Sequence, residues 1–135
     1  MWKILVACLT VLVISAVPRV AAQTTDDIAL QAAITRQLEA LNRDDTAQAF
    51  AIASPMIQRM FQDAPTFMRM VREGFPQVYR SRSHKFLRLE NSDGQLIQRV
   101  LIESAAGTVV ARYEMVVIDG IWRINGCSIE KGVDT

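Results

Sequence analysis

The apolar positions follow a helical spacing in the first part of the chain. Leu30, Ile34, Leu38 and Leu41 recur at intervals of four, four and three residues. This spacing predicts one amphipathic helix of about 15–17 residues, because side chains three or four positions apart share a helix face. The polar run at residues 42–45 is expected to end this helix.

Shorter helices are expected between this polar run and Gly74. The first covers about residues 45–53. Ser54 and Pro55 then form a start signal, since serine caps a helix and proline fits its first position. Asp63 begins the last of these helices, and Gly74 ends it.

The apolar period changes to two near residue 83, which is typical of strands. We expect strands over residues 83–91, 96–104, 108–118 and 121–130, with turns at 93–94, 105–107 and 119–120. Consecutive strands joined by tight turns form an antiparallel meander. A further short strand is allowed near residues 78–80, because the preceding Phe75-Pro76 pair favours extended backbone.

Helices followed by a meander predict an α+β fold, with N-terminal helices packed on a curved C-terminal antiparallel sheet. In the third strand, alternation puts Tyr113 on a face without charged residues, and we expect that face to meet the helices. Val110, Val116 and Ile118 share the opposite face, which is more apolar than a solvated surface needs. That outer face is therefore the candidate surface for a homodimer.

Residues 1–22 carry the features of a secretory signal peptide. Lys3 supplies a positive charge, residues 4–17 are uncharged and mostly apolar, and small residues precede a cleavage point after Ala22. The apolar run has about 14 residues, whereas a membrane-spanning helix needs about 20. We therefore expect export to the periplasm or the medium, no membrane contact after cleavage, and a single domain over residues 23–135.

The net charge of the chain argues against two classes of partner and indicates none. Removal of Lys3 and Arg19 with the signal peptide turns 15 basic and 14 acidic residues into 13 and 14, a net charge of about −1. This balance argues against nucleic acid, which requires a basic surface, and against electrostatic docking on anionic lipid.

Cysteine and histidine are too few to indicate an internal disulfide or a metal centre. Cys8 lies in the signal peptide, so only Cys127 remains after cleavage. Alternation in the last strand puts Cys127 opposite Trp122 and Ile124. We interpret it as a small buried apolar residue, with a reactive or dimer-linking thiol as the alternative. The single histidine, His84, gives no zinc cluster, and we expect no cofactor.

Several short pieces, taken together in their order and spacing, carry a family resemblance. They are Asp44-Asp45, Ala49-Phe50, Ala53-Ser54-Pro55, Phe61, residues 67–71, residues 76–79, Asp119-Gly120, Trp122-Arg123-Ile124 and Gly126-Cys127. The chain resembles the bacterial "domain of unknown function 4864" family, placed among NTF2-like or cystatin-like α+β folds. The resemblance implies that fold and an exported setting, but no activity. NTF2-like proteins include isomerases, dehydratases, binding proteins and dimerisation modules, so the fold does not select a function.

A long first helix, short helices and a curved sheet predict a cone that encloses a cavity. We expect an exported, non-enzymatic domain that binds a small apolar or amphiphilic ligand there, or that pairs through its outer sheet face. The candidate pocket residues are Phe50, Phe67, Val71, Tyr79, Tyr113, Met115 and Trp122.

The alternative is an enzyme of the isomerase or dehydratase type. NTF2-like enzymes place tyrosine hydroxyls and carboxylates inside the cone, where they polarise a carbonyl or move a proton. The resemblance makes Tyr79 or Tyr113, together with a carboxylate, the candidates for that chemistry. Asp44 and Asp45 are adjacent acids, but capping of the second helix explains at least one of them. No catalytic residue is assigned.

Overall fold

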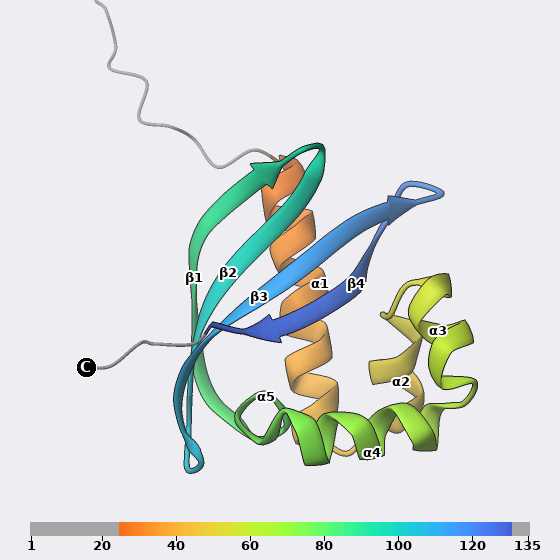
Figure 1. Ribbon diagram of the computed structural model, residues 1–135, viewed down its shortest axis with the longest axis vertical. Helices are drawn as coiled ribbons and strands as arrows, with labels where there is room; N and C mark the ends of the chain where they lie inside the picture. Colours follow the sequence, from red (N-terminus) through yellow and green to blue (C-terminus); the bar gives the residue numbers. More distant parts are fainter. Residues whose placement is uncertain (1–24, 131–135) are drawn as a thin grey trace, which may run out of the picture.

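The computed structural model describes residues 25–130, so the expected signal peptide lies outside the described residues. Helices come first and a single antiparallel sheet follows, in the order β1-β2-β3-β4 (Figure 1). The elements are α1 (Thr25–Asn42), α2 (Thr46–Ala51), α3 (Pro55–Phe61), α4 (Ala64–Gly74), α5 (Pro76–Tyr79), β1 (Ser81–Ser92), β2 (Gln95–Ser104), β3 (Gly107–Ile118) and β4 (Ile121–Ile129). The predicted α+β fold class is confirmed.

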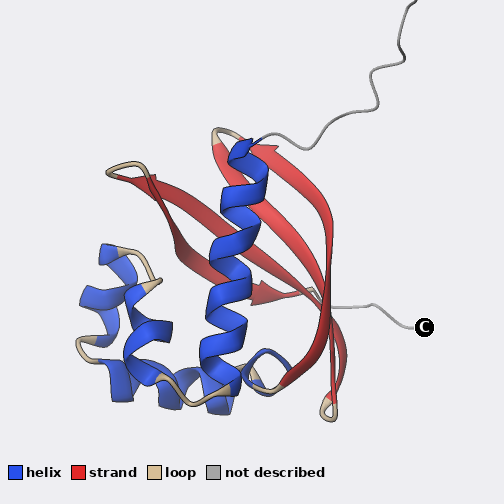
Figure 2. Cartoon of the chain, turned by 180° about the vertical axis from the view of Figure 1, so that it is seen from behind, coloured by secondary structure: helices blue, strands red, loops and turns tan. Residues whose placement is uncertain are grey.

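The first helix supplies the centre of the hydrophobic core. Leu30, Ile34, Leu38 and Leu41 are all buried, as their spacing predicts. Figure 2 shows α1 crossing one face of the curved sheet, while α2, α3 and α4 lie beside it. The opposing sheet face contributes fully buried side chains at Val100, Ile102, Ala111 and Tyr113. We call this the inner face of the sheet.

Side-chain caps set the starts of the short helices. The Ser54 side chain accepts a hydrogen bond from the Ile57 amide at 3.3 Å, and Asp63 accepts one from the Thr66 amide at 2.8 Å. Each bond satisfies an amide that has no partner within its own helix. Both predicted start signals are thereby confirmed.

Residues 78 and 79 belong to the helix α5, and Arg80 caps its end, so the extra strand allowed there was wrong. The Tyr79 amide donates to the Phe75 carbonyl at 2.8 Å, and the Arg80 amide donates to the Pro76 carbonyl at 3.2 Å. Proline restricts the residue before it, but its own fixed φ and missing N–H suit the first turn of a helix. Pro76 therefore starts α5 instead of leading into a strand.

Two of the three turns of the meander use the predicted aspartate-glycine pairs. Asp93 and Gly94 both have positive φ, at 51° and 82°, as do Asp119 and Gly120, at 53° and 77°. Two consecutive positive φ values match the twist of a tight hairpin. The strand register is shifted once between β3 and β4, because Glu114 pairs with Gly126 while Met115 pairs with Ile124. Asn125 is the extra residue of this bulge.

The short linker between α2 and α3 pairs with the edge of the sheet. The Ser54 amide donates to the Ile124 carbonyl at 2.8 Å, and the Ile124 amide donates to the Ile52 carbonyl at 3.0 Å. These bonds make a parallel bridge between Ala53 and Ile124. The Ser54 hydroxyl also donates to the Asn125 side-chain oxygen at 2.7 Å. The helical layer is thus hydrogen-bonded directly to β4.

The outer face of the sheet carries ion pairs. Arg99 forms a two-pronged contact with Glu130, at 2.6 and 2.9 Å. The Arg112 guanidinium nitrogens lie 3.4 Å from carboxylate oxygens of both Glu90 and Glu130. Partly exposed pairs of this kind add little stability, about 0–1 kcal/mol each. Over residues 25–130, no helix combines the length and apolar character that crossing a membrane requires.

Candidate functional site

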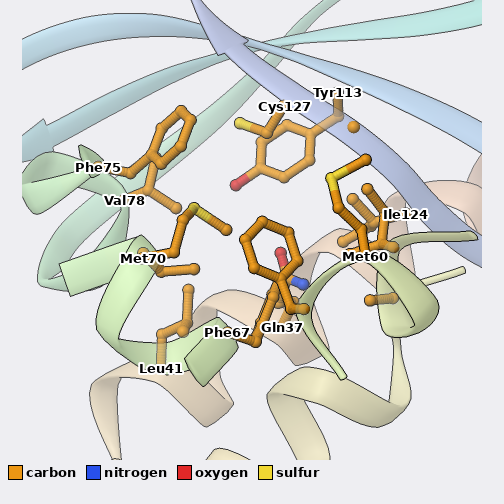
Figure 3. Close-up of a pocket in the computed structure, with 15 residues that line it drawn as sticks. Gln37, Leu41, Met60, Phe67, Met70, Phe75, Val78, Tyr113, Ile124 and Cys127 are labelled. Atoms are coloured by element: carbon orange, nitrogen blue, oxygen red, sulfur yellow. The ribbon is translucent and has the colours of Figure 1, made fainter. Parts of the chain in front are cut away.

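A cavity of about 270 Å³ lies between the helices and the inner face of the sheet (Figure 3). The helices α3, α4 and α5 form much of its wall, and β3 and β4 close the opposite side. Its lining residues are Gln37, Leu41, Ala53, Ile57, Met60, Phe61, Phe67, Met70, Val71, Phe75, Val78, Tyr113, Ile124, Gly126 and Cys127. We refer to this space as the cavity.

The lining of the cavity is apolar and uncharged. None of the described residues that line it is Asp, Glu, Lys, Arg or His. Gln37, Tyr113 and Cys127 supply the polar side-chain atoms. The Gln37 side-chain amide donates to the Ala49 carbonyl at 3.4 Å, which ties it to α2. The cavity therefore suits an apolar molecule with few polar groups.

Tyr113 brings a hydroxyl group into this apolar space. The side chain is 0% exposed, and its hydroxyl points into the cavity (Figure 3). Within residues 25–130, the Tyr113 hydroxyl is the buried side-chain group that lacks a hydrogen-bond partner. Burial, with a smaller contribution from the Cys127 thiol, raises the pKa of Tyr113 well above its usual value. The hydroxyl therefore stays protonated at neutral pH.

Gln98, the neighbour of Tyr113 on β2, forms hydrogen bonds with other residues. Gln98 pairs with Tyr113 across the sheet and is fully buried. Its side-chain amide donates to the carbonyls of Leu87 and Arg99, at 3.0 and 2.9 Å, and its side-chain oxygen accepts from Gln31 at 3.3 Å. None of these bonds involves the Tyr113 hydroxyl.

Cys127 lies beside Tyr113 on the cavity wall, contrary to simple alternation along β4. Alternation put Cys127 opposite Ile124, but both residues line the cavity. The bulge at Asn125 explains the difference, because one extra residue reverses the inside-outside order of the positions that follow. Cys127 is partly exposed as a residue, but the apolar surroundings of its thiol raise the thiol pKa to about 12. A thiol that remains protonated favours the packing interpretation over the reactive one.

We expect Cys127 to react slowly with iodoacetamide in the folded protein. At pH 8, a thiol with a pKa of about 12 holds roughly a thousandfold less thiolate than one with the ordinary pKa of 9.0. Mass spectrometry of the peptide that carries Cys127 gives the rate in the folded protein and in urea. A folded rate within tenfold of the unfolded rate would show that the thiol ionises readily and is accessible.

Tyr79 belongs to a surface cluster outside the cavity lining. Its hydroxyl donates to Asp44 at 2.5 Å, and the Arg80 guanidinium donates to the other Asp44 oxygen at 2.7 Å. Arg80 also donates to the Leu41 carbonyl at the end of α1, at 2.7 Å. The Tyr79 hydrogen bond, followed by that of Arg80, lowers the pKa of Asp44. The cluster fixes the turn between α1 and α2 against α5.

This arrangement bears on the enzymatic alternative. The tyrosine-carboxylate pair, Tyr79 with Asp44, lies at the surface, whereas the tyrosine in the cavity has no acidic neighbour in the lining. Asp45 accepts a hydrogen bond from the Gln48 amide at 3.1 Å, as expected of a helix cap. A reaction that needs both groups would therefore take place outside the cavity.

The structure brings some candidate pocket residues together and separates others. Phe67, Val71 and Tyr113 line the cavity. Phe50 lies behind the wall, with its ring centroid 5.5 Å from that of Phe67. Tyr79 lies in the surface cluster because α5 is a helical turn.

Met115 and Trp122 lie on the hairpin side of the bulge. Met115 is buried in the core, and Trp122 packs against the core while partly exposed. The β4 residues of the lining are Ile124, Gly126 and Cys127, on either side of Asn125. Ligand contact by the seven candidates stays a prediction. Sequence reasoning missed the other twelve lining residues, among them Gln37, Leu41 and Met60. For Gly126 and Cys127, the bulge left no signal in the apolar pattern.

The candidate dimer residues differ in exposure. Val110 is 5% exposed and contributes little to any surface, whereas Val116 and Ile118 are partly exposed. The same outer face carries the Arg99–Glu130 ion pair. Pairing between copies stays a prediction. Across the described part of the chain, no group of three or more His, Cys, Asp and Glu side chains is placed to hold a metal ion.

Comparison with known proteins identifies a family but does not identify an activity. Among curated proteins, no match to this chain is found. One family profile matches residues 23–134, which is nearly the whole chain. The placement of that family among NTF2-like or cystatin-like folds stays a prediction. The chain belongs to the family described as a domain of unknown function, DUF4864.

Proposed function

We propose that this domain binds a small, mostly apolar molecule in the cavity. The observation that carries the proposal is a partly open, uncharged cavity of about 270 Å³ lined by side chains of the helices and the sheet. Ligand pockets commonly measure about 300–1,000 Å³, so this cavity suits a ligand at the small end of the range. An empty apolar space is unfavourable, since its walls lose packing contacts that a ligand would restore.

Flexible side chains offer a route into the cavity. Met60 lines the cavity and is 62% exposed. Phe61 and Met70 line the cavity and also border an open groove at the surface, together with Arg69 and Glu73. Methionine changes rotamer easily, which lets a wall open without moving the backbone. The groove would accommodate the polar end of an amphiphilic ligand.

Export is part of the proposal. The pattern of residues 1–22, with Lys3 before an apolar run and small residues before position 23, is the support for it. A domain of this kind would meet its ligand in the periplasm or the medium. Binding without catalysis agrees with the absence of an acid or a histidine among the described lining residues.

Filling the cavity should abolish binding. Val71 lines the cavity and is buried, so Val71→Phe would occupy the space that a ligand needs. Val117→Phe, a matched control, enlarges an exposed valine outside the lining. We expect native mass spectrometry of protein purified from its own host to show a bound small molecule in wild type and Val117→Phe, but not in Val71→Phe.

Circular dichroism should first confirm that both variants are folded. Retention of the same molecule by folded Val71→Phe would place it outside the cavity. If the wild-type protein carries no molecule, small apolar probes such as cyclohexane derivatives should still raise its melting temperature, and should not raise that of Val71→Phe. Probes without effect on the wild type would refute the proposal.

A further inference from the structure

We infer that the buried end of the ligand is uncharged and carries an acceptor oxygen that accepts a hydrogen bond from the Tyr113 hydroxyl. The inference rests on the proposed function and adds the chemical class of the ligand. Two observations support it: the Tyr113 hydroxyl is a hydrogen-bond donor without a partner, and the described lining of the cavity carries no charged side chain.

The first step concerns Tyr113. Its side chain is fully buried, and the hydroxyl points away from the sheet into the cavity (Figure 3). The Cys127 thiol beside the hydroxyl is a weak hydrogen-bonding group and does not satisfy it. Buried polar groups are nearly always hydrogen-bonded, so a fully buried hydroxyl without an oxygen or nitrogen partner indicates a missing acceptor. The adjacent Gln98 does not supply that acceptor: its side-chain oxygen accepts from Gln31, its amide donates to backbone carbonyls, and none of these bonds involves the Tyr113 hydroxyl.

The second step concerns charge. The described lining contains no cation to balance a carboxylate or phosphate and no anion to balance an ammonium group. A charged group transferred into this space would lose its water without gaining a counter-charge, which is strongly unfavourable. The charged side chains Arg69 and Glu73 border the surface groove and not the cavity. The buried end of the ligand is therefore neutral.

The third step concerns the type of polar group. The tyrosine stays protonated at neutral pH, and a protonated hydroxyl makes its strongest bond as a donor. The complementary group is an acceptor oxygen on an otherwise apolar skeleton, as in a ketone or an ester. An alkane or alkene of the same shape would fill the cavity but would leave the hydroxyl without a partner.

Three ring probes of matched size test this inference. Cyclohexanone carries a neutral acceptor, methylenecyclohexane has the same shape without one, and cyclohexanecarboxylate carries a charge. Binding to the mature protein is measured by NMR titration at neutral pH. We expect cyclohexanone to bind at least tenfold more tightly than methylenecyclohexane. Cyclohexanecarboxylate should not bind in the cavity.

Two tyrosine variants make the test specific. Tyr113→Phe should abolish the preference for cyclohexanone while it retains methylenecyclohexane, because only the donor is lost. Tyr79→Phe, in the surface cluster, should leave the preference unchanged. Infrared spectroscopy gives an independent readout: the carbonyl stretch of bound cyclohexanone should shift to lower wavenumber in wild type and not in Tyr113→Phe.

The outcomes separate the two proposals. Equal binding of cyclohexanone and methylenecyclohexane by the wild type would overturn the present inference and leave cavity binding intact. A preference for cyclohexanone that persists in Tyr113→Phe would also overturn the inference and leave cavity binding intact. If none of the probes binds the wild type and cavity filling by Val71→Phe changes nothing, the proposed function fails together with the inference.

Discussion

Substitution of Ile34 by alanine is expected to lower the free energy of unfolding by about 2–5 kcal/mol. Ile34 is 0% exposed on the buried face of α1. Its replacement removes buried methyl and methylene groups and leaves a void that the surrounding residues fill only in part. Because typical domains are stable by only about 5–15 kcal/mol, such a loss is a large fraction of the total.

The same helix offers a matched control. Ile28 is also in α1 but is 55% exposed, so Ile28→Ala should change the free energy of unfolding by no more than about 0.5 kcal/mol. Urea unfolding followed by tryptophan fluorescence measures both variants. If Ile28→Ala and Ile34→Ala lowered the free energy of unfolding by similar amounts, the burial of only one face of α1 would be contradicted.

Replacement of Tyr113 by phenylalanine is expected to stabilise the ligand-free domain by about 1–3 kcal/mol, although tyrosine is the native residue. The hydroxyl has lost its water on burial and has gained no hydrogen bond in return. Phenylalanine fills nearly the same volume without the polar group. Stability sacrificed at one position is a familiar property of binding sites.

Tyr79→Phe provides the opposite case. The Tyr79 hydroxyl donates to Asp44, so its removal should destabilise the protein. Chemical unfolding of the two variants under identical conditions compares them directly. A loss of stability in Tyr113→Phe would mean that the hydroxyl already has a partner in the free protein, such as a bound water molecule.

Local signals in the sequence predicted most of the fold. The spacing of Leu30, Ile34, Leu38 and Leu41 identified α1, and the aspartate-glycine pairs identified two of the turns. These features depend on neighbouring residues alone, through helix periodicity and the φ preference of glycine. The α5 turn was missed because Phe75-Pro76 fits both an extended exit and a helix start.

Prediction of the cavity lining required information that local sequence patterns do not contain. Phe67, Val71 and Tyr113 could be assigned to it from the apolar faces of one helix and one strand. Cys127 could not, because the bulge at Asn125 forms where β4 also pairs with the linker at Ala53. That contact joins residues about 70 positions apart, and only the tertiary arrangement determines it.

The bridge between Ala53 and Ile124 also limits how this protein can polymerise. A sheet grows into a fibril when each copy offers two free edges, one for the copy before it and one for the copy after it. In residues 25–130, the linker occupies part of the β4 edge, which leaves β1 as the long open edge. The same short segment that contributes Ala53 to the cavity wall thus shortens the edge through which another copy could add a strand.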